Sequence, residues 1–428
     1  MGNSSEDRRG TLLFLTRDYP GDNYAERAFA YPELAALARK FDRIIIMPLD
    51  YQGTRLGYPD SLPPGVEVDW SLAHDPVTHN RALKAFYIFH PFALQSLASM
   101  VGEARTLRQW GKGVLQAVNT LSIGRVVLRT LRRHGLGPHD TLLYAFWFLD
   151  IGAALARIAR EDGWKCAVRG HTSDIFTEKT LFRSDKVRNR LLRGVSKVLT
   201  ISNTGREYLA QRFPDHKEKF VTMPLGSVKL YESGLYTPSD GLSRPLEILT
   251  VARIEPVKRI DMIFRILERL AMLNPERSML WTVIGSGTLA DKISQQVKTN
   301  RAGNLKINFT GMLTNEQIQK RYASNPPQWF MLASRSEGVP VSMGEAMSYG
   351  VPVITTNVGQ IYELADEICS VNLGDTPDIE EAAEQLSRVI FDTGLQQNMS
   401  AAAKRRWERL FNGEPHSEAT ARLLRSLL

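Results

Sequence analysis

The chain has 428 residues, of which 43% are hydrophobic, so it is long enough for two domains with sizeable cores. Its two cysteines, Cys166 and Cys369, exclude a disulfide framework and fit a reducing compartment. The net charge of +8 is uneven, because residues 1–235 hold 33 basic and 24 acidic side chains while residues 236–428 hold 21 and 22. A basic first half suits nucleic acid, an anionic membrane or an anionic substrate. We expect no nucleic acid partner, since the sequence has no zinc-ligand spacing, helix-turn-helix pattern or aromatic RNA-binding sheet.

The ends and the hydropathy of the chain bear on its location. The first ten residues are polar and do not resemble a signal peptide, and no apolar run approaches the length of a membrane span. We therefore expect a cytoplasmic protein.

The first half alternates short apolar runs with helical patterns, which predicts a doubly wound α/β domain over residues 1–235. A helix is predicted over about 25–40. Buried parallel strands are predicted at residues 11–16, 42–49, 66–70, 141–147, 165–170, 197–202 and 220–225.

A basic helical insertion interrupts this domain at about residues 81–135. Between 101 and 135 seven Lys and Arg side chains stand against Glu103 alone, and Trp110 begins an apolar stripe that continues to Val118. Such a segment can lie on an anionic membrane, or it can pack its stripe into the core and leave its charges in water. The sequence leaves both interpretations open.

The second half predicts another doubly wound domain over residues 236–405, after a linker at 226–244 that is rich in Gly, Pro and Ser. A helix begins at about Ile260, and the residues from 406 to 428 form a further helix that could return to the first domain. Strands are predicted at residues 246–251, 279–284, 306–309, 329–333 and 352–355.

The stretch from Ser334 to Glu363 carries the strongest chemical signal. Glu337 lies in the loop after a buried strand, where ligands of such sheets bind. A helix follows and ends at Gly350, and its free N–H groups and dipole favour an anion at its start. Glu345, a turn or so into this helix, has two oxygens that can accept from two hydroxyls.

These residues resemble the motif of the family 4 retaining glycosyltransferases, which have the GT-B fold. That family has a Ser-x-x-Glu-Gly-x-Pro loop followed by Glu-Ala-Met-x-x-Gly-x-Pro-Val. The matching residues here are Ser334, Glu337, Gly338, Pro340, Glu345, Ala346, Met347, Gly350, Pro352 and Val353. The resemblance implies an α/β protein of two Rossmann-like domains that face each other across a cleft.

The resemblance also implies roles for individual residues. Arg253 and Lys258 match the family's Arg-x-x-x-x-Lys spacing, and His171 follows the strand that ends at Gly170. These three residues and Glu337 are the predicted catalytic set. The predicted donor-binding residues are Gly21, Gly285, Gly287, Met312, Leu313, Gly338, Val339, Pro340, Ser342 and Glu345. On the acceptor side the predicted residues are Asp18, Tyr19 and Asp174.

The expected chemistry is the departure of a nucleoside diphosphate from a sugar. Its growing charge needs a metal or fixed cations, and the sequence has no Asp-x-Asp motif to hold a metal, so we expect Arg253 and Lys258 to supply them. The expected protein is thus a metal-independent, retaining hexosyltransferase without a cofactor, using a UDP- or GDP-sugar in bacterial-type surface polysaccharide or glycolipid synthesis.

The basic first half fits a glycan or lipid-linked acceptor and a peripheral position on the inner face of the cytoplasmic membrane. Two other classes stay open. A sugar-nucleotide epimerase or a phosphorylase can have the same fold, and a non-catalytic relative would only bind a partner.

Overall fold

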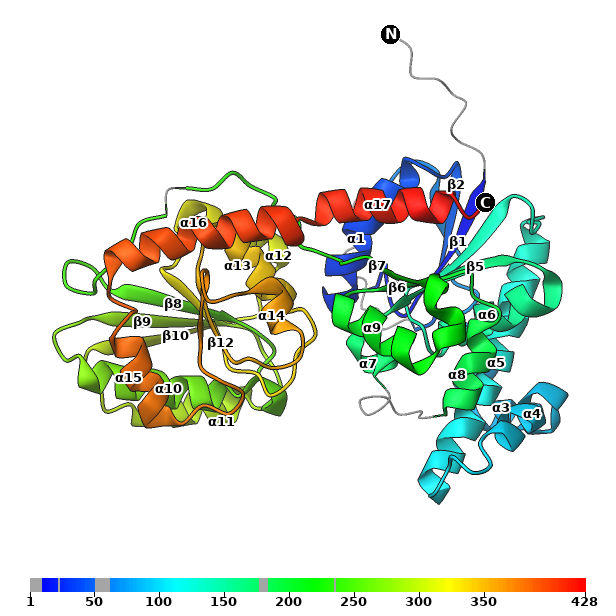
Figure 1. Ribbon diagram of the computed structural model, residues 1–428, viewed down its shortest axis with the longest axis horizontal. Helices are drawn as coiled ribbons and strands as arrows, with labels where there is room; N and C mark the ends of the chain where they lie inside the picture. The colour runs from blue at the N-terminus through cyan, green and yellow to red at the C-terminus, as the bar shows by residue number, and fades with distance from the viewer. Residues whose placement is uncertain (1–9, 22–23, 51–61, 177–183, 235) are drawn as a thin grey trace, which may run out of the picture. The chain divides into compact units, whose positions relative to one another are not determined.

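The structure, a computed structural model, describes residues 10–21, 24–50, 62–176, 184–234 and 236–428. The chain divides into two compact units (Figure 1). The first unit runs up to Leu225 and includes Glu414–Leu428, and the second is Gly226–Gly413.

The boundary between the two units lies after Leu225, nearer the N-terminus than the predicted boundary at residue 235. The reason is that residues of the expected linker are hydrogen-bonded within the second unit. The Ser227 N–H donates to Phe411 O (2.9 Å), and the Gly413 N–H donates to Ser227 O (2.9 Å). The Gly234 N–H donates to Ala323 O (2.7 Å). A Gly-, Pro- and Ser-rich stretch without periodicity therefore need not be a free linker.

The first unit contains a seven-stranded parallel sheet of order β3-β2-β1-β4-β5-β6-β7. The chain builds outward from β1 in one direction and then from β4 in the other, so the loops after β1 and β4 meet where ligands of doubly wound sheets bind. The strands are β1 (Thr11–Thr16), β2 (Arg43–Pro48), β3 (Val66–Val68), β4 (Thr141–Ala145), β5 (Lys165–Gly170), β6 (Lys197–Thr200) and β7 (Phe220–Thr222).

Helices cover both faces of this sheet, as the continuous apolar strands require. One core lies between the sheet and the helices α5, α6 and α8, and the other lies between the sheet and α1 and α17. The helices are α1 (Tyr24–Ala38), α2 (Pro76–His79), α3 (Arg81–Lys84), η1 (Ala85–Phe89), α4 (Pro91–Ser99), α5 (Leu107–Arg133), α6 (Ile151–Asp162), α7 (Thr172–Ile175), α8 (Asp185–Leu192), α9 (Asn203–Arg212), η2 (Pro214–Lys219) and α17 (Gly413–Arg425).

The predicted helical insertion is confirmed as α3, η1, α4 and α5. Thr106 and Gln109 form a capping box at the start of α5. In the stripe that could have faced a membrane, Val118 is buried and Trp110 packs against the main core of the unit, whereas Leu115 between them is 42% exposed. For Trp110 and Val118, core packing is the correct interpretation.

A buried ion pair ties the C-terminal helix α17 to the first unit. Arg169 on β5 is fully buried, and its Nη2 pairs with the carboxylate of Glu33 on α1. Tyr144 donates to the other oxygen of Glu33 (2.6 Å), and Arg169 Nε donates to the Tyr144 hydroxyl (3.0 Å). Arg169 Nη2 also lies 3.4 Å from Oγ1 of Thr420 on α17. Two charges are accepted in this core because each is paired and hydrogen-bonded.

The second unit contains a six-stranded parallel sheet of order β10-β9-β8-β11-β12-β13, with its switch between β8 and β11. The helices α10, α11 and α15 cover one face, and α12, α13, α14 and α16 cover the other (Figure 1). The strands are β8 (Leu246–Val251), β9 (Met279–Ile284), β10 (Leu305–Gly311), β11 (Trp329–Leu332), β12 (Val353–Thr355) and β13 (Ser370–Asn372). The helices are η3 (Pro256–Lys258), α10 (Ile260–Leu273), α11 (Ala290–Gln296), η4 (Val297–Thr299), α12 (Asn315–Ser324), α13 (Val341–Ser348), α14 (Ile361–Leu364), α15 (Ile379–Ser387) and α16 (Thr393–Leu410).

Candidate functional site

A charged pair lies at the carboxyl edge of the second sheet, next to the switch point. Lys258, at the end of η3, forms an ion pair with Glu337, which lies in the loop between β11 and α13. Ser334 donates its hydroxyl hydrogen to the same carboxylate oxygen (2.6 Å). Both charged side chains are mostly buried. Two of the predicted catalytic residues are therefore in direct contact, 79 positions apart in the chain.

Arg259 holds the loop that carries Glu337. It has a positive φ of 49°, which L-residues rarely adopt, and its side chain is buried. Its guanidinium donates to Ala333 O and to Ser334 O (2.8 Å). Thr356 donates to the same Ser334 carbonyl (2.8 Å). No sequence pattern marks Arg259 beyond its place beside Lys258.

Gly359 supports the same loop by close approach. Its φ is +65°, and a Cβ atom built on it would lie 1.8 Å from the carbonyl oxygen of Glu337. Any larger residue must therefore push the Glu337 backbone away. This glycine falls inside the motif stretch, but its role depends on a contact that the sequence does not reveal.

Glu345 is buried on α13 and faces α12. Its Oε1 accepts a hydrogen bond from the side-chain amide of Asn315. Burial raises the pKa of Glu345 to about 7, although the bond from Asn315 works in the opposite direction. Asn315 was not predicted, since a polar residue in the first turn of a helix is common.

The glycines Gly285 and Gly287 bring two loops together. Cβ atoms on them would lie 1.9 Å from Ala252 O and 2.5 Å from Ile254 O, so each glycine packs directly against the loop after β8. Arg253 lies in that loop with an exposed side chain. This close packing explains why both positions need glycine. The contact of Gly285 and Gly287 with a donor stays a prediction.

The other predicted donor residues cluster around the same edge. Met312, which is exposed, and Leu313 directly follow β10, while Gly338 and Val339 precede α13. Pro340 is the N-cap residue of α13, and Ser342 lies in its first turn. The structure thus places the predicted donor-binding residues of the second unit on loops and helix starts that follow β8 to β11.

In the first unit, His171 and Asp174 connect the loops after β4 and β5. His171 Nε2 donates to Phe146 O (2.8 Å), and its ring lies 4.2 Å from that of Trp147. Burial and then the Arg169 charge lower the pKa of His171 to about 3, so it is neutral. Asp174 accepts from the N–H groups of His171 (2.6 Å) and Phe148 (2.8 Å), while burial raises its pKa to about 7.

The loop after β1 is fixed by Glu26, which was not predicted. Its carboxylate accepts from the backbone N–H groups of Arg17 (2.9 Å), Asp18 (2.6 Å) and Tyr19 (2.8 Å) and from the indole of Trp147 (2.8 Å). The Tyr19 side chain is buried in the core.

Gly21 closes a tight turn in the same loop, because its N–H donates to Asp18 O (2.5 Å). This agrees with the ordinary interpretation of a lone loop glycine. Contacts of Asp18, Tyr19 and Gly21 with a substrate stay predictions.

The described ranges contain no group of three or more His, Cys, Asp and Glu side chains arranged to hold a metal ion. Within the same ranges, no helix has both the length and the apolar character of a membrane span.

Fold and site together define the class of protein. The structure of HepE from Anabaena in complex with UDP-glucose superimposes with a TM-score of 0.64 at 18% identity, over 97% of this chain and all of that one (100%). Sucrose-phosphate synthase from Thermosynechococcus elongatus superimposes with a TM-score of 0.65 at 14% identity, over 98% and 99% of the two chains. The predicted GT-B fold is confirmed.

The family signal lies in the second unit. Residues 240–406 match the family described as "Glycosyl transferases group 1", which confirms the resemblance to GT-B glycosyltransferases. The amylovoran biosynthesis glycosyltransferase AmsK of Erwinia amylovora is 32% identical over 160 residues, which are 35% of this chain and 37% of AmsK. The matches span 27% to 37% of the curated relatives' lengths. Membership of family 4 in particular stays a prediction.

Proposed function

We propose that the protein is a retaining, family 4 glycosyltransferase that moves a hexosyl group from a UDP- or GDP-sugar to a glycan or lipid-linked acceptor, without a metal ion or other cofactor. The observation that carries the proposal is the Lys258–Glu337 pair at the carboxyl edge of the second sheet, within the segment that matches the family. Residues that are far apart in the chain converge where the fold binds ligands.

The proposed mechanism assigns cations to the leaving group. Lys258 and Arg253 offset the charge that grows on the diphosphate as its bond to the sugar breaks. Glu345 accepts from the two ribose hydroxyls of the nucleotide. Each carboxylate oxygen can accept more than one hydrogen bond, so the bond from Asn315 to Oε1 leaves room for both hydroxyls. Glu337 accepts from a sugar hydroxyl and fixes the position of Lys258.

His171 is also assigned to the sugar. Because its imidazole is neutral, it contributes hydrogen bonding and neither a positive charge nor an acidic proton at neutral pH. Its Nε2 is already bonded to Phe146 O, which fixes the ring.

The relatives support this choice of substrates. HepE was crystallised with UDP-glucose, and AmsK is named as a glycosyltransferase of amylovoran biosynthesis. We extend both to this chain as a role in bacterial-type surface polysaccharide or glycolipid synthesis. The basic excess of residues 1–235 supports peripheral contact with the anionic inner face of the cytoplasmic membrane.

The test is the release of nucleoside diphosphate from a panel of UDP- and GDP-sugars, measured with the full chain and without acceptor, in the presence and absence of EDTA. Slow release from one donor, insensitive to EDTA, supports the proposal. An epimerase would interconvert the donor without releasing nucleoside diphosphate, and a phosphorylase would require inorganic phosphate.

Two results would overturn parts of the proposal. If no sugar nucleotide shifts the thermal unfolding of the protein or is hydrolysed, the chain is a non-catalytic relative. If EDTA abolishes release and manganese or magnesium restores it, the charge on the diphosphate is met by a metal rather than by Arg253 and Lys258.

A further inference from the structure

The helical insertion exposes an unusual amount of apolar surface. Phe86, Phe89 and Leu107 are 81%, 80% and 91% exposed, and they are the three most exposed large apolar side chains among the residues that the structure describes. Phe86 and Phe89 lie three positions apart in the 3₁₀ helix η1, so they share one face. Large apolar side chains exposed to water in one short segment of the chain indicate an interaction surface.

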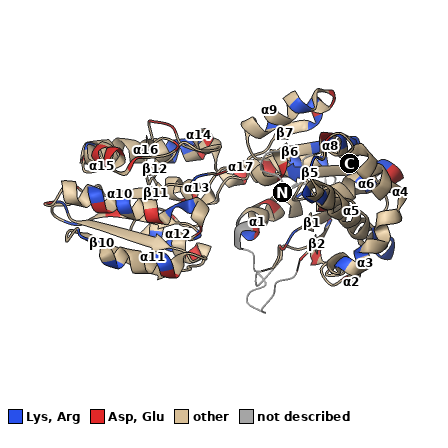
Figure 2. Cartoon of the chain, turned by 90° about the horizontal axis from the view of Figure 1, so that it is seen from below, with Lys and Arg blue, Asp and Glu red and all other residues tan. Residues whose placement is uncertain are grey.

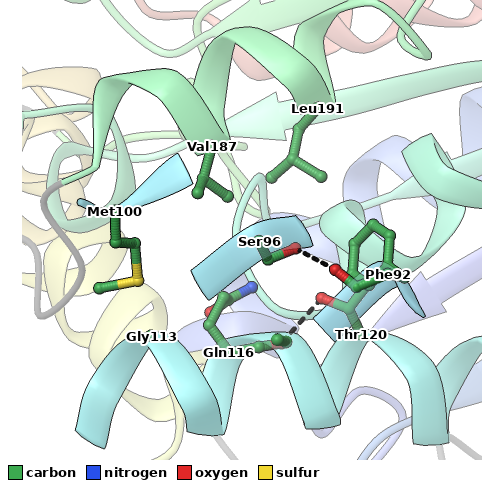
Figure 3. A pocket seen from close by; sticks show the side chains of 9 residues that line it. Phe92, Ser96, Met100, Gly113, Gln116, Thr120, Val187 and Leu191 are labelled. Carbon is green, nitrogen blue, oxygen red and sulfur yellow. Dashed lines mark hydrogen bonds between the residues drawn. The ribbon is translucent and has the colours of Figure 1, made fainter. Parts of the chain in front are cut away.

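This exposure does not come from a poorly formed core. Phe92 of α4, Ala117 and Leu121 are buried together, and the pocket between α4, α5 and α8 has a volume of about 10 Å³, room for about one water (Figure 3). The hydroxyls beside that cavity bond within their own helices, Ser96 to Phe92 O and Thr120 to Gln116 O, both at 2.8 Å. The insertion is a packed element with a second, outward apolar face.

The surroundings of the exposed side chains are basic. Residues 81–112 contain five Lys and Arg side chains and one acidic side chain, Glu103, and Figure 2 shows basic positions on α3. Glu103 is turned toward α8, where it accepts from the Ser184 hydroxyl and the Lys186 N–H (3.3 Å). Arg81, Arg105 and Arg108 are exposed and form no ion pair with any described residue.

We propose that residues 81–112 form a docking surface for an anionic lipid bilayer, with Phe86, Phe89 and Leu107 inserted among the headgroups and Arg81, Arg105 and Arg108 contacting anionic lipids. Aromatic and leucine side chains beside arginines are the composition of interfacial segments. The surface is not the stripe of α5 that begins at Trp110, because Trp110 and Val118 of that stripe pack inward.

A second copy of the chain fits this surface less well. In a two-fold dimer the patch would meet itself, so its basic side chains would face those of the partner copy. Like charges brought together in this way oppose association, whereas anionic lipids neutralise them. The proposed function enters this inference only as the reason for binding a membrane. A lipid-linked acceptor would be reached there.

The test is co-sedimentation of the full chain with vesicles of phosphatidylcholine alone and of phosphatidylcholine and phosphatidylglycerol in equal parts. We expect binding to the anionic vesicles only, weakened by salt because screening acts within about 8 Å at physiological ionic strength. The variant Phe86→Ser, Phe89→Ser, Leu107→Ser should lose at least about tenfold in affinity, since each side chain contributes apolar burial. The variant Arg81→Gln, Arg105→Gln, Arg108→Gln should lose the preference for anionic vesicles.

Matched controls lie in the second unit. Leu242, Tyr362 and Ile368 are exposed apolar side chains, and their joint change to Ser should leave vesicle binding unchanged. Equal binding of the wild type to both vesicles, or wild-type binding by the Phe86→Ser, Phe89→Ser, Leu107→Ser variant, would refute the surface. A change in oligomeric state of that variant without a change in vesicle binding would assign the surface to a second copy instead. Vesicle binding needs no donor, so failure here leaves the transferase proposal to its own test.

Discussion

Glu345 shows how a buried carboxyl, proposed here as a site residue, can lower the stability of the fold. Burial raises its pKa from 4.5 to about 7, so the folded state holds the proton more tightly than the unfolded state does. The free energy of unfolding therefore falls as the pH rises from 4.5 to 7, and the loss is complete above pH 7. At about 1.4 kcal/mol per pKa unit, the loss reaches roughly 3 kcal/mol.

Glu345→Gln should remove this loss, because Gln keeps the bond from Asn315 and carries no charge. We expect the variant to match the wild type near pH 4 and to exceed its free energy of unfolding at pH 8 by up to about 3 kcal/mol. Its affinity for UDP should fall, since the ribose loses a carboxylate. Urea unfolding at the two pH values and UDP titration measure both effects.

The control is Glu276→Gln, which removes the same charge from an exposed position and should change neither quantity. If Glu345→Gln is less stable than the wild type at pH 8, burial of the ionised Glu345 carboxyl does not lower the free energy of unfolding. If it binds UDP as tightly, Glu345 does not bind the ribose.

Lys258 and Glu337 form an ion pair, a contact that the sequence did not predict between these two members of the catalytic set. Lys258→Ala should lower kcat/KM for donor hydrolysis by about 100-fold or more, as for other groups that stabilise charge in the transition state. Glu337→Gln should cause part of the same loss, because it frees Lys258 from its position. The double variant should therefore lose less than the product of the two single losses.

A comparison pair is Arg269 and Glu380, which form an exposed ion pair on the same unit. Arg269→Ala and Glu380→Gln should leave hydrolysis unchanged, singly and together. Independent, multiplicative losses at Lys258 and Glu337 would mean that the ion pair does not operate in the reacting complex.

At the residue scale, the sequence singled out candidate side chains that a motif names and missed those that hold them. Glu337, Glu345 and Lys258 were singled out because their residue types and spacing are specific. Arg259 and Glu26 bind backbone groups of loops, and such contacts leave no pattern in the sequence. The partners of Arg259 lie 74 and 75 positions away and are brought close by the packing of β8 against β11, whereas the backbone partners of Glu26 lie 7 to 9 positions away.

Among the elements, most strands were predicted at nearly their observed bounds, because a buried parallel strand is a short continuous apolar run. Helix orientation was harder to predict. The stripe of α5 fits either a membrane or a core, and only tertiary contacts decided for the core. The exposed faces of α3 and η1 carry too few turns for a periodic signal.

The loop between β11 and α13 should depend on Gly359 more than on other glycines with positive φ. Gly359→Ala adds a Cβ that collides with the Glu337 backbone, so donor binding and hydrolysis should fall together with stability. Gly374 has a similar φ of +75°, but a Cβ there meets nothing within 4 Å. Gly374→Ala should therefore cost only the backbone strain, about 1 kcal/mol.

Urea unfolding and donor hydrolysis of the two variants measure this difference. We expect Gly374→Ala to keep hydrolysis near the wild-type rate despite its lower stability. Equal effects of the two substitutions on hydrolysis would show that the position of Glu337 does not depend on Gly359.

Taken whole, the molecule contains two units with separate cores, and the proposed donor residues lie mostly in the second. The sequence predicted two doubly wound domains, because each half repeats the alternation of strands and helices. It could not place the boundaries closely, since the hydrogen bonds of Ser227 and Gly234 and the docking of α17 depend on the finished fold.

The two units should respond separately to ligand and to mutation. UDP binding should protect backbone amides of β8 and β11 from hydrogen exchange, by about 2.7 kcal/mol when UDP is at 100 times its Kd.

Arg169→Met leaves Glu33 buried without its partner, so it should lower the protection of β4 and β5 by about 3–5 kcal/mol. The protection of β8 and β11 in this variant, and its gain with UDP, should match the wild type. Arg129→Met removes an exposed arginine of α5 and serves as the control. Hydrogen exchange read by mass spectrometry assigns each effect to its unit, and a UDP-dependent gain confined to β4 and β5 would place the nucleotide in the wrong unit for the proposed mechanism.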